Sequence, residues 1–210
     1  MSNPIITLDN LRDRVKAELS DFRWLHTDGV ERMAARLARI YDPAKENLLR
    51  AAALLHDVTK EKKNDEQIII CERYGYKLRE DEIGSPAILH AITASLIIPE
   101  EYPELACNEI ISAVRWHTTG REDMSLCEKI IYLADYIEDT RKYEECIALR
   151  GVFFDAHPEK MTAEKAMEHL DRIILQSLCM TVEDITAKGG RVCAETLAAK
   201  EYLENQLIGE

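Results

Sequence analysis

Apolar residues recur at helical spacing along most of this 210-residue chain. The first run repeats every three or four residues and consists of Leu8, Leu11, Val15 and Leu19. It predicts an amphipathic helix that begins after a cap at Thr7 or Asp9. A second run extends from the neighbourhood of His26 to Ile40 and predicts a second helix with His26 at its start.

The third predicted helix runs from Pro43 to the adjacent pair His56 and Asp57, with the proline in its first turn. Further helices are predicted over residues 65–73, 86–98, 103–116, 125–139, 163–187 and 194–207. The isoleucines at positions 68–70 also fit a buried strand. A helix is favoured there, because no second strand-like run lies nearby to pair with it. The pattern therefore predicts an all-α protein built as a helical bundle.

The composition is that of a soluble globular protein, with 46% hydrophobic and 31% charged residues. Its length suits one domain over residues 1–210 with a continuous core. No apolar run approaches the roughly 20 residues of a membrane-spanning helix. Residues Met1–Ile6 lack the basic and apolar regions of a secretory signal. We therefore expect a cytoplasmic protein without a membrane partner.

The net charge of −12 argues against nucleic acid or an anionic membrane as a partner, because both require a basic face. A polyanionic substrate would need local positive charge. The six cysteines are far apart and form no C-x-x-C pair, so we expect them to be reduced and mostly buried. We expect His157 and His169 to face solvent.

The strongest candidate for chemistry is the end of the third predicted helix, ALLHDVTK, which places His56 beside Asp57. Burying that carboxylate costs several kcal/mol unless a cation or hydrogen bonds compensate. A divalent cation would satisfy both side chains. Lys60 follows about one helical turn later and could place its ammonium near a phosphate oxygen. An adjacent His and Asp also occur on many solvated helix ends, so the pair alone leaves both interpretations open.

Four more candidate ligands lie in or beside other predicted helices, and they are His26, His90, His117 and Asp135. Two of them have a plainer interpretation by themselves: His26 as an exposed capping residue and His90 as a satisfied core histidine. Asp135 lies beside an apolar stripe, which favours a cation or a basic partner. Such residues can converge when several helices of a bundle face one centre.

Four imidazoles and two carboxylates exceed the four ligands of a structural zinc site, and no cysteine thiolate accompanies them. This set favours a catalytic site. His and Asp ligands with open positions suit iron, manganese, cobalt or magnesium, and two such ions about 3.5 to 4 Å apart can clamp a displacement at phosphorus.

The order His26, His56–Asp57, His90, His117 and Asp135 resembles the HD-domain metal-dependent phosphohydrolases. The strings WLHTDGV, ALLHDVTK, LHA, WHTTG and KIIYLADYIE are similar to those of the YqeK family, the symmetrical bis(5′-nucleosyl)-tetraphosphate hydrolases. The resemblance spans roughly residues 7–187. It leaves residues 191–210 as a C-terminal helical extension of a single HD domain.

The resemblance implies an all-α HD-domain bundle with a metal centre in its core. It implies hydrolysis of diadenosine tetraphosphate, and of related dinucleoside polyphosphates, into two molecules of ADP (or GDP) by metal-activated water. The metal would be iron, with manganese, cobalt, magnesium or nickel as alternatives. The family's metal ligands fall on His26, His56, Asp57 and Asp135.

The remaining roles are also implied by the resemblance. His90 and His117, with Thr118 beside them, match positions that face the phosphates or complete a second metal site. Lys60 and Arg141 match basic positions that hold the phosphates. The expected catalytic residues are His90, His117 and Lys60. The expected substrate-binding residues are His26, Asp57, Lys60, His90, His117, Thr118, Asp135 and Arg141.

Other interpretations stay open from the sequence. The chain could be an HD-type nucleotidase or phosphodiesterase acting on another nucleotide, or a nucleotide sensor without catalysis. Arg141 could also be a surface residue paired with Glu138 or Glu145. Tyr136 and Tyr143 are candidates for base recognition, with packing as the alternative. The protein could also assemble as a homodimer.

Overall fold

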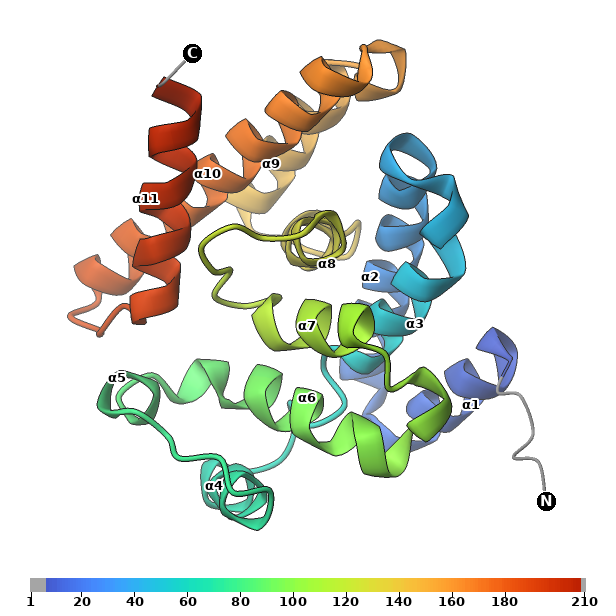
Figure 1. Cartoon of the computed structure of the whole chain (residues 1–210), viewed down its shortest axis with the longest axis vertical. Coiled ribbons are helices and arrows are strands. Elements are labelled where there is room, and N and C mark those ends of the chain that lie inside the picture. Colours follow the sequence, from blue (N-terminus) through green and yellow to red (C-terminus); the bar gives the residue numbers. More distant parts are fainter. Residues whose placement is uncertain (1–6, 209–210) are drawn as a thin grey trace.

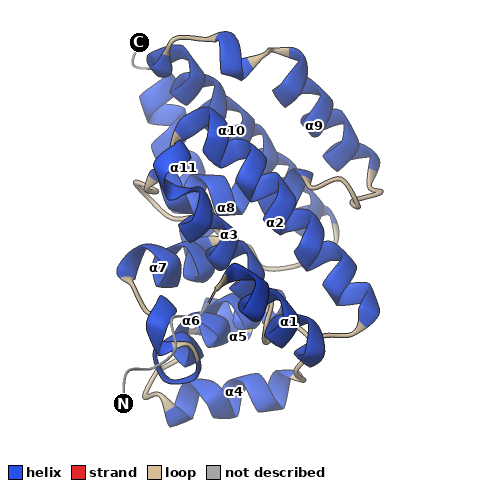
Figure 2. Cartoon of the chain, turned by 90° about the vertical axis from the view of Figure 1, so that its right-hand side faces the viewer, coloured by secondary structure: helices blue, strands red, loops and turns tan. Residues whose placement is uncertain are grey.

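The computed structural model describes residues 7–208, and in that range the secondary structure is entirely helical (Figures 1 and 2). The predicted all-α class is confirmed. Residues Met1–Ile6, where no secretory signal is predicted, lie outside the described range together with residues 209–210. None of the described helices is both long enough and apolar enough to cross a membrane.

Eleven α-helices follow one another along the described residues. They are α1 Leu8–Glu18, α2 Asp21–Tyr41, α3 Glu46–Leu55, α4 Asn64–Arg73, α5 Glu80–Ile83, α6 Leu89–Glu101, α7 Asn108–Trp116, α8 Leu126–Ile137, α9 Glu144–Asp155, α10 Ala163–Ala187 and α11 Ala194–Ile208. Side-chain oxygens cap several of them: Thr7 accepts from the amide of Asn10, and Ser125 forms a capping box with Glu128 at the start of α8.

Helix α3 lies at the centre of the core, in contact with α1, α2, α7 and α8. Its residues 51–55 are all buried, which explains why this stretch is apolar on every side. The three consecutive alanines let the neighbouring helices approach closely. The chain leaves α3 at His56 and Asp57, so both side chains remain inside the core.

The other helices pack on two sides of this centre (Figure 1). Helix α6 packs on α7 and carries α4 on its outer side, whereas α10 packs on α8, α9 and α11. Figure 2 shows the same order from the side, with α4 at one end and α9 and α10 at the other. The helices that carry the candidate ligands, α2, α3, α6, α7 and α8, therefore form the middle of the molecule.

The prediction of one helix over residues 103–116 was wrong. Pro103–Leu105 form a 3-10 turn, and α7 begins only at Asn108. Cys107 has an extended backbone, which interrupts the helical hydrogen bonds between the two pieces. The helix predicted over residues 65–73, by contrast, is present as α4, so the strand alternative is excluded.

Two helices were not predicted. Helix α5 has four residues, too few to show a hydrophobic period. Helix α9 buries Cys146, Leu149 and Phe153 at helical spacing, but exposed Ile147 and Val152 obscure that stripe in the sequence.

The prediction for His169 was wrong too, whereas His157 is exposed as predicted. His169 is half-buried, its Nε2 lies 3.0 Å from the carbonyl oxygen of Phe153, and its ring stacks on that phenyl ring. Four of the six free cysteines are buried, and Cys107 is the exposed one.

Candidate metal centre

The six predicted ligands converge on one place, which we call the core cluster. They are His26 from α2, His56 and Asp57 directly after α3, His90 from the first turn of α6, His117 directly after α7, and Asp135 from the last turn of α8. The four imidazoles and Asp57 are buried, and Asp135 is partly exposed. The convergence of separate helices that the sequence suggested is thus present in the structure.

One half of the core cluster surrounds Oδ2 of Asp57. That oxygen lies 3.6 Å from Nε2 of His26 and 3.4 Å from Nε2 of His56. The two imidazole Nε2 atoms are 3.4 Å apart, and Oδ1 of Asp135 lies 2.9 Å from Nε2 of His26. The ligand atoms of His26, His56 and Asp57 are close enough together to hold one divalent cation.

The other half of the core cluster surrounds Oδ1 of Asp57. This oxygen lies 3.2 Å from Nε2 of His90 and 3.9 Å from Nε2 of His117, and the two imidazole nitrogens are 3.1 Å apart. Asp57 therefore presents one oxygen to each half. A carboxylate placed in this way can bridge two neighbouring cations.

Hydrogen bonds on the far side of two rings fix which nitrogen faces the cluster. Nδ1 of His56 lies 2.5 Å from the carbonyl oxygen of Ala53, and Nδ1 of His117 lies 2.7 Å from that of Val114. A carbonyl oxygen only accepts, so each Nδ1 carries the proton and donates. The lone pair of each Nε2 then points into the cluster, which is the arrangement that metal-binding histidines show.

His26 is oriented by Glu138, a residue that the sequence analysis did not assign to the site. Oε1 of Glu138 lies 3.1 Å from Nδ1 of His26, and both carboxylate oxygens accept hydrogen bonds from Thr140. Glu138 is buried, and a methyl group at Gly29 would collide with it. Glu138 lies one helical turn after Asp135, which is the signal that could have found it.

Three basic side chains surround the core cluster. Arg23, which was also missed, lies with Nη1 2.7 Å from Oδ2 of Asp57, and it precedes His26 by about one turn of α2. Arg141 binds the Oδ1 of Asp135 at 2.7 Å through Nη2, so its side chain pairs inside the site and not with Glu138 or Glu145. The third, Lys60, lies beside His90.

His90 differs from the other imidazoles of the core cluster. Its Nδ1 lies 3.1 Å from Nζ of Lys60, which as an ammonium can only donate, so Nδ1 accepts and Nε2 carries the proton. That Nε2 faces Asp57 and the hydroxyl of Thr118, the latter at 3.3 Å. Protein partners alone satisfy His90 in this arrangement. Binding a cation through Nε2 would require its other tautomer.

The electrostatics of the core cluster favour ionised carboxylates. Burial alone would raise the pKa of Asp57, but the nearby imidazoles hold it well below its usual range. Burial likewise opposes ionisation of Asp135, and the charge of Arg141 keeps its pKa low. Burial, reinforced by His56, lowers the pKa of His117 to about 4, which leaves that ring neutral. These are the protonation states that a metal ion requires of its ligands.

His26 responds in the opposite direction. Burial lowers its pKa, but the hydrogen bonds to Asp135 and Glu138 outweigh burial and raise the pKa to about 9. The surroundings of its Nε2 therefore stabilise a positive charge. That charge can be a proton on Nε2 or a metal cation in its place. The donor set, imidazoles and ionised carboxylates without a thiolate, fits a divalent cation of the iron, manganese or cobalt type.

Comparison with known proteins agrees with this geometry. The family model described as the HD domain matches residues 23–140. The chain belongs to the HD domain family. The matched segment of this HD-domain protein contains all six residues of the core cluster as well as Arg23 and Glu138, and it ends one residue before Arg141.

Two relatives of this HD-domain protein are both named symmetrical bis(5'-nucleosyl)-tetraphosphatase. The one from Halalkalibacterium halodurans is 34% identical over 192 residues, which are 90% of this chain and 92% of the relative. The one from Bacillus subtilis is 29% identical over 191 residues, which are 90% of this chain and 93% of the relative.

A solved structure is also similar. It is the crystal structure of a "predicted HD superfamily hydrolase involved in NAD metabolism" from Clostridium acetobutylicum, which is 30% identical and superposes with a TM-score of 0.80. The superposition covers 97% of this chain and 100% of the other. The fold shared with that structure therefore extends beyond residues 23–140, over the C-terminal helices α10 and α11 as well.

Proposed function

We propose that this HD-domain protein is a metal-dependent hydrolase that cleaves diadenosine tetraphosphate, and related dinucleoside polyphosphates, symmetrically into two nucleoside diphosphates. The observation that carries the proposal is the core cluster, in which five chain segments bring four imidazoles and two carboxylates together beside three basic side chains. The names of the two relatives support the choice of substrate and the symmetrical cleavage.

We assign the residues to two neighbouring cation positions. His26, His56, Asp57 and Asp135 would hold the first cation, for which we propose iron. His90 and His117, with the second oxygen of Asp57, would hold another. Bound cations supply positive charge against the phosphate oxygens and the Lewis acidity that makes water a nucleophile at neutral pH.

The protein's own cations bind and orient the phosphate chain. Lys60 and Arg141 reach the core cluster from opposite sides, one beside His90 and the other at Asp135, so an extended polyphosphate placed over the cluster would contact both. Arg23, at Asp57, adds a third positive charge. Together they provide the local positive charge that a protein of net charge −12 needs in order to bind a polyanion.

His90 is the residue we assign to proton transfer during turnover whenever it does not bind a cation. Its ring lies between the ammonium of Lys60, on the Nδ1 side, and Thr118 on the Nε2 side. A proton donated from Nε2 to the departing diphosphate oxygen could be replaced through Nδ1 from Lys60. Full turnover by a His90→Ala variant would remove His90 from the mechanism.

The test is product chromatography after incubation with diadenosine tetraphosphate. The protein is reconstituted in turn with iron, manganese, cobalt, magnesium or nickel, and the products are resolved at early times. We expect ADP alone, with iron the most active metal. Equal amounts of ATP and AMP would contradict symmetrical cleavage. Free phosphate from a mononucleotide, with diadenosine tetraphosphate intact, would instead identify a nucleotidase, and nucleotide binding without any product would identify a sensor.

A further inference from the structure

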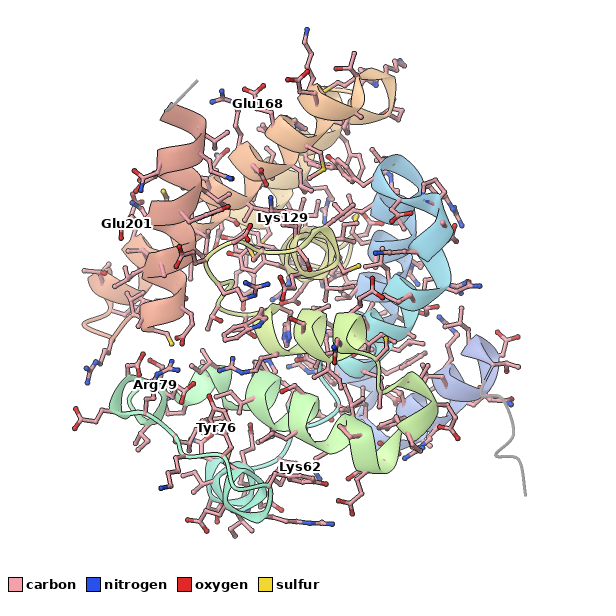
Figure 3. All side chains as sticks on the ribbon, in the orientation of Figure 1. Lys62, Tyr76, Arg79, Lys129, Glu168 and Glu201 are labelled. Carbon is pink, nitrogen blue, oxygen red and sulfur yellow. The ribbon has the colours of Figure 1, made fainter. Side chains whose placement is uncertain are left out.

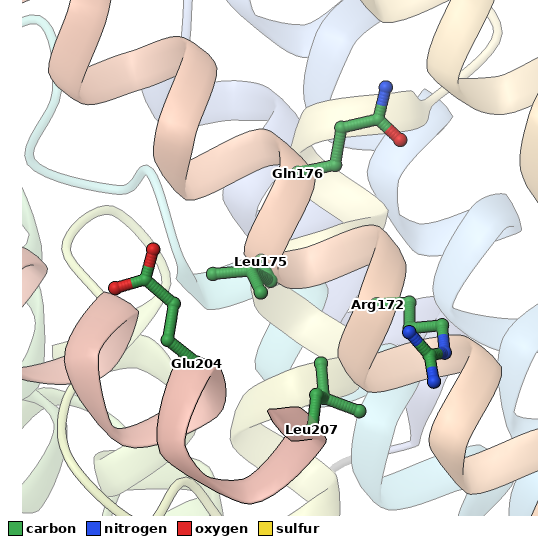
Figure 4. Close-up of a pocket in the computed structure, with 5 residues that line it drawn as sticks. All are labelled: Arg172, Leu175, Gln176, Glu204 and Leu207. Carbon is green, nitrogen blue, oxygen red and sulfur yellow. The ribbon is translucent and has the colours of Figure 1, made fainter.

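Of the hollows that lie along α10, two differ in what they adjoin. The first, shown in Figure 4, has a volume of about 420 Å³ and is lined from α10 and α11 alone, by Arg172, Leu175, Gln176, Glu204 and Leu207. None of these helices carries a residue of the core cluster. The second has a volume of about 790 Å³ and lies between the end of α8, the loop that follows it, the first turn of α9 and the C-terminal half of α10. We call it the α8–α10 pocket.

The α8–α10 pocket begins where the core cluster ends. Arg141 lines the pocket and also binds the side chain of Asp135, which in turn lies 2.9 Å from His26. Tyr136, the residue after Asp135, lines it as well. A ligand that has phosphates at the core cluster could therefore extend past Arg141 directly into the pocket.

Beyond Arg141, the lining of the α8–α10 pocket is acidic and unsuited to phosphate. Glu145, Glu183 and Asp184 contribute carboxylates, and of these only Asp184 is neutralised, by Lys188 at 2.7 Å. None of the ion pairs among residues 7–208 involves Glu145 or Glu183. Two uncompensated carboxylates repel a polyanion, but they accept hydrogen bonds from hydroxyl and amino groups.

The same pocket offers flat and polarisable surface. Tyr143 is 64% exposed, and Tyr136 and Met180 also line the wall. An exposed tyrosine ring offers a face on which a planar heterocycle can stack. The volume falls within the roughly 300 to 1,000 Å³ of small-molecule sites.

We propose that the α8–α10 pocket binds one nucleoside of the substrate, with its base stacked on Tyr143 and its hydroxyl or amino groups donating to Glu145 and Glu183. This inference rests on the proposed function, because it takes the phosphates of the same ligand to lie at the core cluster. It makes Tyr143 a specificity-determining residue that separates nucleotides from inorganic polyphosphates.

The experiment is calorimetric titration of the metal-reconstituted protein with two probes, ADP and inorganic pyrophosphate. In a Tyr143→Ala variant we expect ADP to bind about 10-fold more weakly, since stacking contributes on the order of this factor per base. Pyrophosphate lacks a nucleoside, so its affinity should not change. Tyr143→Phe keeps the ring and should bind ADP as the wild type does.

The control variant is Ile147→Ala, which truncates another exposed apolar side chain one turn further along and outside the pocket lining. It should leave both affinities unchanged. The inference is overturned if Tyr143→Ala binds ADP normally, if both probes weaken equally, or if Tyr143→Phe loses as much as alanine. The proposed function fails separately, when the wild-type protein releases no ADP from diadenosine tetraphosphate.

Discussion

Among residues 7–208, metal-ligand atoms come within 4.8 Å of one another in two places, and only one of these places has the surroundings of a metal site. The first is the core cluster around Asp57. The second, the α5–α11 cluster, consists of Asp81, Cys193 and Glu195, with Arg79 beside it at α5 (Figure 3). The core cluster contains two such sets of three residues, which share Asp57, and the α5–α11 cluster contains one, so a set of three ligand atoms alone cannot identify a metal site.

In the α5–α11 cluster, donors of the protein itself pair with the carboxylates. Arg79 binds Glu195 at 2.5 Å and Asp81 at 3.2 Å, and the backbone amide of Ala194 donates to Asp81 at 3.0 Å. Burial and the hydrogen bond to Glu195 raise the pKa of the Cys193 thiol to about 12, so no thiolate forms near neutral pH. These contacts fasten the start of α11 to α5.

The core cluster differs in its imidazoles, because arginines pair with its carboxylates too, Arg23 with Asp57 and Arg141 with Asp135. Imidazole nitrogens face one another at 3.1 and 3.4 Å, and two of these rings have already committed their Nδ1 protons to backbone carbonyls. The comparison teaches that imidazole nitrogens gathered around carboxylates indicate a cation site even where arginines pair with those carboxylates, whereas carboxylates and a thiol paired with an arginine and an amide indicate a structural contact.

The largest effect should come from Asp57→Asn. Asp57 presents one oxygen to each half of the core cluster, so the variant should lose bound metal. Its kcat/KM for diadenosine tetraphosphate should then fall by about 1,000-fold, equivalent to about 4 kcal/mol of transition-state stabilisation. Asp81→Asn, in the α5–α11 cluster, is the matched control and should keep both its metal content and its activity. Equal losses in the two variants would remove the distinction between the clusters.

A smaller effect is expected from Glu138→Gln, which replaces the carboxylate that orients His26. Metal affinity should drop by about 10- to 100-fold, because residues that hold a ligand in place contribute on this scale. The measurement is competition with a chelator, followed by elemental analysis. Asp139→Asn changes the exposed neighbouring carboxylate and should have no effect. Unchanged affinity in Glu138→Gln would show that His26 needs no partner.

The ligands of the core cluster could be predicted from the sequence, but the residues that orient them could not. Each of the six ligands of the core cluster lies in or beside an apolar-periodic segment, which is why they could be picked out before their distances were known. Glu138 and Arg23 were missed because a charged residue beside a ligand looks the same in the sequence whether it faces solvent or the site.

The α5–α11 cluster could not be predicted at all. It joins residues more than 100 positions apart through a helix of four residues, which is too short to show a period, and the helix predicted over residues 194–207 does not reveal what its first turn contacts. The same limit applies to the two pieces of the predicted helix 103–116, which a local backbone turn separates. Periodicity identifies helices that bury a face, but not how short connecting turns bring distant side chains together.

Asp81→Ala tests the structural role of the α5–α11 cluster and should have a more modest effect. The variant removes the acceptor for the amide at the start of α11, a loss of about 1 kcal/mol, similar to that of a helix cap. The expected fall in Tm is about 2 to 4 °C, with activity unchanged. Glu80→Ala, at an exposed neighbouring position, is the control. A loss of activity without a loss of stability would contradict the structural role.

The smallest effect concerns pH. The amide of Ala194 and the Arg79 guanidinium hold the pKa of Asp81 below its usual range. Burial opposes a low pKa at Glu195, but Cys193 and Arg79 lower it nevertheless. The folded pKa values thus lie below the unfolded ones, which are about 3.9 for Asp and 4.3 for Glu. Their stabilising contribution is therefore complete above those values and is lost as the pH falls through the folded ones.

Urea denaturation at pH 6, 5, 4 and 3 measures this contribution. The free energy of unfolding of Asp81→Asn should fall less steeply with decreasing pH than that of the wild type, so the two should converge at low pH. Parallel curves would show that Asp81 does not contribute to acid sensitivity.

The most direct test of the central claim is anomalous diffraction from crystals of the iron-reconstituted protein, recorded on both sides of the iron absorption edge. The account predicts the strongest anomalous peak inside the core cluster, within bonding distance of His26, His56, Asp57 and Asp135. A core cluster without a peak, or a peak at Asp81, Cys193 and Glu195 instead, would contradict it.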